Sequence, residues 1–182
     1  AHHELLLHFA RPYRDGNGSQ LGIIYRDFGV NNETTSALAM SKTRTSVADG
    51  YTKILADLDF AETNLPATTA TAPPPVNATT NKTYRTTKAA AIALKMRVRL
   101  HMGDWANVIA EGNKLVPTTP TSLTSYPGFT SPVGGWKMEI SPVTPFTAGG
   151  WQGNETIFSI RNASTDNGGV NGALPNMLGN TS

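Results

Sequence analysis

The sequence predicts a mainly α-helical fold in which helical hairpins carry long irregular loops and one short β element. Apolar residues recur every three or four positions in the stretches 46–65 and 87–116, which is the period of an α-helix. The segments between and after these stretches are rich in Gly, Pro, Thr and Asn, which favour turns and loops. With 182 residues, the chain has the size of one domain.

The helix predicted over 46–65 has clear ends. Ser46 can accept a hydrogen bond from the backbone amide of Asp49, as a residue preceding a helix commonly does. Pro66 follows the last apolar residue and cannot continue the helical hydrogen-bond pattern. One amphipathic helix is therefore expected between Ser46 and Pro66.

The stretch 87–116 predicts two helices joined by a tight turn. Gly103 favours the end of the first helix, and Asp104 can cap the start of the second. Two amphipathic helices with so short a connection form an antiparallel hairpin. Trp105 is in phase with Val108, so the pattern places it in the core.

The remaining segments are less regular. Residues 1–10 predict the end of a helix, and 11–44 predict a long ordered loop. The range 66–84 contains too little apolar surface to fold alone and is expected to be a linker. The region 117–182 is loop-rich, except that its β-branched and aromatic run 155–160 predicts a short strand.

Composition excludes several classes of function. A formal net charge of +2 does not indicate a polybasic surface, so no nucleic-acid partner is expected. The absence of cysteine rules out disulfides, thiolate catalysis and Cys-ligated metals within these residues. No apolar run approaches the roughly 20 residues that a membrane span needs. The chain opens as if inside a helix, so we expect a piece of a longer protein.

Four sequence segments, in this order, resemble the SusD/RagB-like family of nutrient-binding proteins. The most specific is the hairpin sequence TTKAAAIAL followed by RVRLHMGDW (86–105). It is preceded by HHELLLHFARPY (2–13) and SVADGYTKILADLDFAETNLP (46–66), and followed by NETIFSI (154–160). Each segment alone is weakly specific, but their shared order extends over residues 1 to 160.

The resemblance implies a fragment of a SusD-like α/α superhelix in which 87–116 is one tetratricopeptide-like hairpin. It also implies a cell-surface lipoprotein of a Bacteroidetes-type outer membrane. Such a protein holds an oligosaccharide or another nutrient, without a cofactor, for a SusC-like TonB-dependent transporter. Its lipid anchor would lie outside these residues. Two alternatives remain: a helical-repeat scaffold that binds only proteins, and a carbohydrate-active hydrolase.

Loop aromatics are the candidate ligand contacts, because sugar rings stack their C–H faces on aromatic side chains. These candidates are Tyr126, Phe129, Trp136 and Trp151. A second candidate cluster, in which polar residues adjoin an aromatic, consists of Tyr25, Arg26 and Asn31. The competing interpretations are loop aromatics buried for packing and Asn side chains that bond their own turns.

No catalytic or metal site is predicted. His3, Glu4 and His8 resemble a zinc-protease motif, but the second histidine comes five residues after the first instead of four. The histidines are therefore expected to be solvated. No Gly-x-Ser-x-Gly nucleophile motif occurs. The acidic residues of the helix over 46–65, Asp57, Asp59 and Glu62, are expected to face water.

Overall fold

The structure is a computed structural model, and it describes residues 1–67, 85–116, 129–141, 143 and 154–158. Most of the described secondary structure is helical, which confirms the mainly α-helical prediction. None of the helices in these ranges combines the length and apolarity needed to cross a bilayer.

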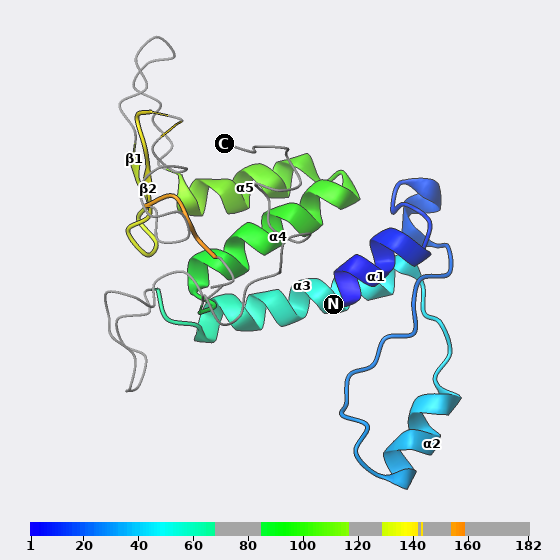
Figure 1. Cartoon of the computed structure of the whole chain (residues 1–182). Coiled ribbons are helices and arrows are strands. Elements are labelled where there is room, and N and C mark those ends of the chain that lie inside the picture. Colours follow the sequence, from blue (N-terminus) through cyan, green and yellow to red (C-terminus); the bar gives the residue numbers. More distant parts are fainter. Residues whose placement is uncertain (68–84, 117–128, 142, 144–153, 159–182) are drawn as a thin grey trace, which may run out of the picture.

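Three helices pack side by side to form the scaffold (Figure 1). They are α3 (Val47–Asn64), α4 (Lys88–Met102) and α5 (Trp105–Leu115). Helix α4 lies in the middle and contacts both of the others. The antiparallel hairpin expected over 87–116 is thus present as α4 and α5.

The helix ends are held by the residues that the sequence indicates. Gly103 adopts a left-handed conformation with φ of 77° after α4, which glycine reaches without steric cost. Asp104 then caps α5 by accepting a hydrogen bond from the Asn107 amide at 3.4 Å. Ser46 caps α3 in the same way, with 3.0 Å to the amide of Asp49.

Helix α1 (His2–Phe9) packs against α3. Leu6 is only 2% exposed and is the apolar anchor of α1. The helices approach closely at Gly50, where an added Cβ atom would lie 3.2 Å from a Leu6 methyl carbon.

The prediction of a continuous loop over 11–44 is wrong. This range contains a short 3₁₀ helix, η1 (Asp15–Gly18), and an α-helix, α2 (Glu33–Ser41). The side chain of Asn32 accepts a hydrogen bond from the Thr35 amide at 2.8 Å, which starts α2. Helix α2 lies apart from the scaffold, so it lacks the wide buried stripe by which helices are recognised (Figure 1).

The β structure differs from the prediction. Two short strands, β1 (Phe129–Thr130) and β2 (Lys137–Met138), pair antiparallel, with Phe129 opposite Met138. The predicted strand over 155–160 is wrong in its described part, because residues 154–155 form a turn and residues 156–158 have an irregular backbone, so they form no strand. This segment is attached to the hairpin by single bonds, one from the Lys137 amide to the Asn154 carbonyl at 3.1 Å. Residues 68–84 of the predicted linker lie outside the described ranges.

Buried side chains form two clusters along the scaffold. The first lies between α1, α3, α4 and the 23–25 segment and consists of Leu6, Ile23, Tyr25, Val47, Tyr51, Ile54, Leu55 and Val98. The second lies under the β-hairpin and consists of Ala89, Ile92 and Leu115.

The prediction that Trp105 belongs to the core is wrong, since its side chain is 59% exposed. Helix α5 instead buries the face that carries Glu111 and Leu115. At about 100° per residue, Trp105 and Ile109 lie about 120° and 160° around the helix from Glu111. Both apolar residues therefore face outward, and Ile109 is 64% exposed.

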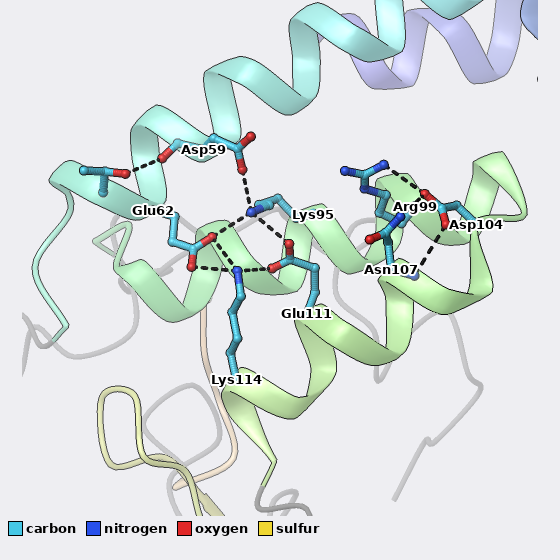
Figure 2. Close-up of polar contacts among 9 residues, drawn as sticks. Asp59, Glu62, Lys95, Arg99, Asp104, Asn107, Glu111 and Lys114 are labelled. Carbon is cyan, nitrogen blue, oxygen red and sulfur yellow. Dashed lines mark hydrogen bonds and ion pairs between the residues drawn. The ribbon is translucent and has the colours of Figure 1, made fainter.

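A buried ammonium group joins the three scaffold helices (Figure 2). The Lys95 side chain on α4 is 4% exposed, and its Nζ atom lies 2.6 Å from Asp59 and 2.7 Å from Glu62 on α3. On the other side it lies 2.9 Å from Glu111 of α5. Lys114 adds a second bridge, at 3.0 Å from Glu62 and 2.8 Å from Glu111.

The expectation that the α3 acids face water is wrong for Glu62, whose side chain is 21% exposed and is shared between two lysines. Asp57 and Asp59 are exposed as expected, although Asp59 also pairs with Lys95. Asp57 accepts a hydrogen bond from the Tyr25 hydroxyl at 2.6 Å. The helical pattern of the sequence places these acids on one helix. It does not reveal the lysines of α4 and α5 that lie beside Asp59 and Glu62 in the folded protein.

Replacing Lys95 by methionine should lower the free energy of unfolding by about 3–5 kcal/mol, because it leaves buried carboxylates without their cation. The matched control is Lys53→Met, which removes a half-exposed pair with Asp49 at 3.1 Å and should cost about 0–1 kcal/mol. Urea denaturation of both variants measures the difference. Equal midpoints for the two variants would contradict a central role for Lys95.

The same cluster predicts acid sensitivity. Burial opposes ionisation of Glu62, but hydrogen bonds from Lys95 and Lys114 outweigh it and lower the pKa of Glu62 below its ordinary 4.5. A lowered folded-state pKa means that Glu62 stabilises the fold above pH 4.5 and that this contribution disappears as pH falls through the folded-state pKa.

The Glu62→Gln variant should therefore be less stable at pH 7 and lose less stability than the wild type on acidification. Urea titrations between pH 7 and about pH 3 measure this, with Glu33→Gln on the exposed α2 as the control. Parallel pH profiles for wild type and Glu62→Gln would show that the cluster does not set acid stability.

Candidate functional site

A groove of about 380 Å³ lies where the β1–β2 hairpin meets α4 and α5. We call it the hairpin groove. Its wall comes from the hairpin and the 154–158 segment, and its floor from α4 and the end of α5. The residues that line it are Ala93, Met96, Leu115, Val116, Phe129, Ser131, Trp136, Lys137, Met138, Glu155 and Ile157. Apolar side chains dominate this surface.

Trp136 is fixed at the base of the groove. It ends the turn between the strands, where its carbonyl oxygen accepts a hydrogen bond from the Ser131 amide at 2.6 Å. Its side chain packs against the cluster that contains Ile92 and Leu115. Gly134 makes this placement feasible, because a Cβ atom there would lie 2.7 Å from the indole nitrogen. The groove therefore contains an indole that the scaffold holds in one position.

The indole nitrogen of Trp136 is buried and has no hydrogen-bond partner in the described part of the chain. A buried N–H group without a partner lowers the stability of the fold.

Polar groups occur at the margin of the groove. Among the described residues, the Lys137 ammonium group makes no ion pair and can donate hydrogen bonds outward. Glu155 already accepts the Glu139 amide at 2.6 Å through one carboxylate oxygen. Glu139 in turn accepts from the Asn154 amide group at 2.5 Å. Glu139 and Glu155 thus connect the β-hairpin to the 154–158 segment.

A second groove of about 730 Å³ adjoins the first and shares Ala93, Glu155 and Ile157 with it. Its other lining residues are mostly aliphatic: Leu58, Ala61, Thr86, Ala90, Ala91, Leu94, Arg97, Thr156 and Phe158. Arg97 is its one basic residue within the described lining. No aromatic residue predicted as a ligand contact belongs to it.

The structure brings together two of the predicted contact residues, Phe129 and Trp136, in the hairpin groove. Trp151 and Tyr126 lie outside the described ranges, so their roles stay predictions. The sequence did not identify Lys137 and Glu155 as groove residues. The Gly134–Gly135 pair marks a tight turn before Trp136, and this turn was the only local sign that the neighbouring residue Lys137 lies in a hairpin.

The second predicted cluster lies elsewhere, because none of its residues lines either groove and Tyr25 belongs to the first core cluster. Tyr25 is 5% exposed, and its ring stacks on His2 with centroids 4.0 Å apart. Burial, followed by the hydrogen bond to Asp57, raises the pKa of Tyr25 above its usual range. Tyr25 therefore has a structural partner for both its ring and its hydroxyl group.

Arg26 and Asn31 are exposed near α2. The Asn31 amide donates a hydrogen bond to the Thr35 hydroxyl at 3.1 Å, beside the start of that helix. A ligand role for either residue stays a prediction. In the described ranges, no three His, Asp or Glu side chains converge in a way that could hold a metal ion.

Few known proteins resemble this chain closely enough to be matched to it. No protein-family model matches the chain, and no curated protein matches it. A solved structure from Bacteroides vulgatus, provisionally described as a sugar binding protein, matches with 24% identity and a TM-score of 0.46. The match covers 60% of this chain and 21% of that one, so it involves about a fifth of the Bacteroides protein. Similarity this low carries no argument about function, and membership in the SusD/RagB-like family stays a prediction.

Proposed function

We propose that the protein binds an oligosaccharide or a related nutrient in the hairpin groove and does not transform it. In this proposal it is a lipid-anchored protein of an outer-membrane surface that passes the ligand to a TonB-dependent transporter. The transporter and the membrane location rest on the resemblance of four sequence segments to the SusD/RagB-like family. The binding site rests on the geometry of the groove.

The observation that carries the proposal is the meeting of Phe129 and Trp136 in one groove of about 380 Å³. Small-molecule sites are concave, mostly apolar and roughly 300–1,000 Å³ in volume, with a few polar groups that orient the ligand. The ammonium group of Lys137 is such a polar group. A sugar ring can place its C–H face on an aromatic side chain and a hydroxyl group toward this ammonium group.

The proposed binding is non-catalytic because the described lining of the groove presents one carboxylate, Glu155, which is already hydrogen bonded to the Glu139 amide. Glycoside hydrolysis generally needs two carboxyl groups on opposite sides of the scissile bond. If the protein were a hydrolase, it would release reducing sugar from a panel of polysaccharides, and Glu155→Gln would abolish the release. We expect no release from the wild-type protein.

A second candidate function is protein binding through α5, for which the outward-facing Trp105 and Ile109 are the specific observation. They are 59% and 64% exposed and lie four residues apart on the same side of the helix. Exposed aromatic residues of this kind are enriched in protein interfaces. Loss of a protein complex in Trp105→Ala, with glycan binding unchanged, would show that both surfaces are used.

For glycan binding, Phe129→Ala and Trp136→Ala should each weaken affinity by about 1–3 kcal/mol, the scale for losing a buried aromatic contact. Isothermal titration against a panel of oligosaccharides measures the change. The matched control is Trp105→Ala, which removes an exposed tryptophan that lines neither described groove. The control should bind like the wild type.

Because Trp136 also packs on the second core cluster, its variant needs a folding control. Circular dichroism and thermal melting show whether Trp136→Ala remains folded at the titration temperature. Phe129→Ala provides an independent test if it does not. Binding that survives in both folded variants would place the site outside the hairpin groove, and no binding to any glycan by the wild type would refute the proposed function.

A further inference from the structure

Two histidines from distant parts of the sequence contact each other where α1 meets α4. The Nε2 atom of His3 lies 3.1 Å from the Nδ1 atom of His101, and the ring planes differ by 21°. His3 is 5% exposed, so the expectation that the α1 histidines are solvated is wrong for it, and His101 is half-buried. This hydrogen bond connects the first helix of the chain to the central helix of the scaffold.

The contact depends on protonation. A hydrogen bond between two imidazole rings needs an N–H group on one nitrogen and a lone pair on the other. It therefore exists when the pair is neutral or carries one proton. When both rings are protonated, both facing nitrogens are donors and both rings are positive, so the contact becomes repulsive.

The groups around His3 do little to stabilise a positive charge on its ring when His101 is also protonated. Within α1, the Glu4 carboxylate lies 3.8 Å from Nδ1 of His3 and favours its protonation, but burial of the ring opposes protonation more strongly. From α4, Arg97 is 3.8 Å from the same carboxylate and also opposes protonation of His3. From α3, the ring of Tyr51 faces His3 edge-on, with centroids 6.1 Å apart.

The other ring nitrogen of His3, Nδ1, is not exposed to solvent and forms no hydrogen bond within the described residues. Burial first, and the electrostatic effect of the neighbouring His101 second, lower the pKa of His3 below its ordinary 6.5. The neutral ring is thus the form that suits the docked α1.

We propose that the His3–His101 pair is a pH-sensitive latch that docks α1 on the scaffold near neutral pH and releases it in mild acid. Release separates the rings, lets each bind its own proton in water and exposes Leu6, which is 2% exposed in the docked helix. No covalent change is involved. The latch is independent of the proposed glycan function.

The direction of the effect follows from the lowered pKa of His3. Above pH 6.5 the ring is neutral in the docked and the released state, so docking is strongest there. Below pH 6.5 the released state takes up a proton that the docked state does not, until the pKa of docked His3 is reached. The docking equilibrium should therefore weaken by up to about tenfold per pH unit in that window, because one proton is taken up.

Hydrogen–deuterium exchange of the whole protein tests the latch directly. For α1 amides, protection factors corrected for the intrinsic pH dependence of exchange should stay constant between about pH 7.5 and pH 6.5, and then fall by up to about tenfold per pH unit toward about pH 5.5. Amides of α5 are the internal reference and should keep their protection over the same range. Equal behaviour of α1 and α5 would overturn the proposal.

A matched pair of variants separates the latch from general acid effects. His3→Gln keeps a side chain that can hydrogen bond to His101 but does not titrate, so α1 protection should become independent of pH. His8→Gln makes the same change at a side chain that is 71% exposed, and it should retain the wild-type profile. If His3→Gln does not fold, the wild-type exchange profile still decides the question, and an unchanged pH profile in a folded His3→Gln would refute the latch.

Discussion

The buried ammonium group of Lys95 is the constraint on which the helical scaffold depends. Removing a charge from water costs several kcal/mol unless oppositely charged groups replace the solvent. Here Asp59 and Glu62 come from α3 and Glu111 from α5, so all three helices must be in place before Lys95 is satisfied. Apolar packing alone would tolerate some sliding of one helix along another. The ion cluster instead favours one alignment, because each carboxylate must reach the same nitrogen.

This alignment also sets the geometry of the hairpin groove. Ile92 and Ala89, on the first half of α4, pack with Leu115 of α5 into the cluster that supports Trp136. The β-hairpin itself has only two residues in each strand, and a hairpin of that size is not stable alone. Its position therefore depends on the helices beneath it. A rigid helical platform that carries a short hairpin is a common way to present a binding surface.

The sequence predicted what local chemistry determines. Helix α3 and the α4–α5 hairpin follow from apolar periodicity and from caps such as Ser46 and Asp104. Periodicity does not reveal which side of a helix a neighbour covers, so Trp105 was assigned to the core although α5 buries Glu111 instead. Glu111 is buried because it meets Lys95 on another helix, which is a nonlocal fact. The groove combines Phe129 and Trp136 with helix residues that are distant in the sequence. The sequence therefore identified the aromatic residues as candidate contacts, but not the groove that they line.

Two basic side chains on α4, Lys95 and His101, have opposite electrostatic surroundings, and this contrast determines which part of the protein responds first to acid. Lys95 has three carboxylates within 2.9 Å, which together raise its pKa against the effect of burial and keep it charged. His101 instead faces another histidine, whose nearest carboxylate is 3.8 Å from the ring. Protonation therefore disturbs the α1 end of α4 at a pH where the Lys95 cluster is still ionised. Figure 1 shows α1 and the β-hairpin at opposite ends of the scaffold, so docking of α1 can change while the groove keeps its shape.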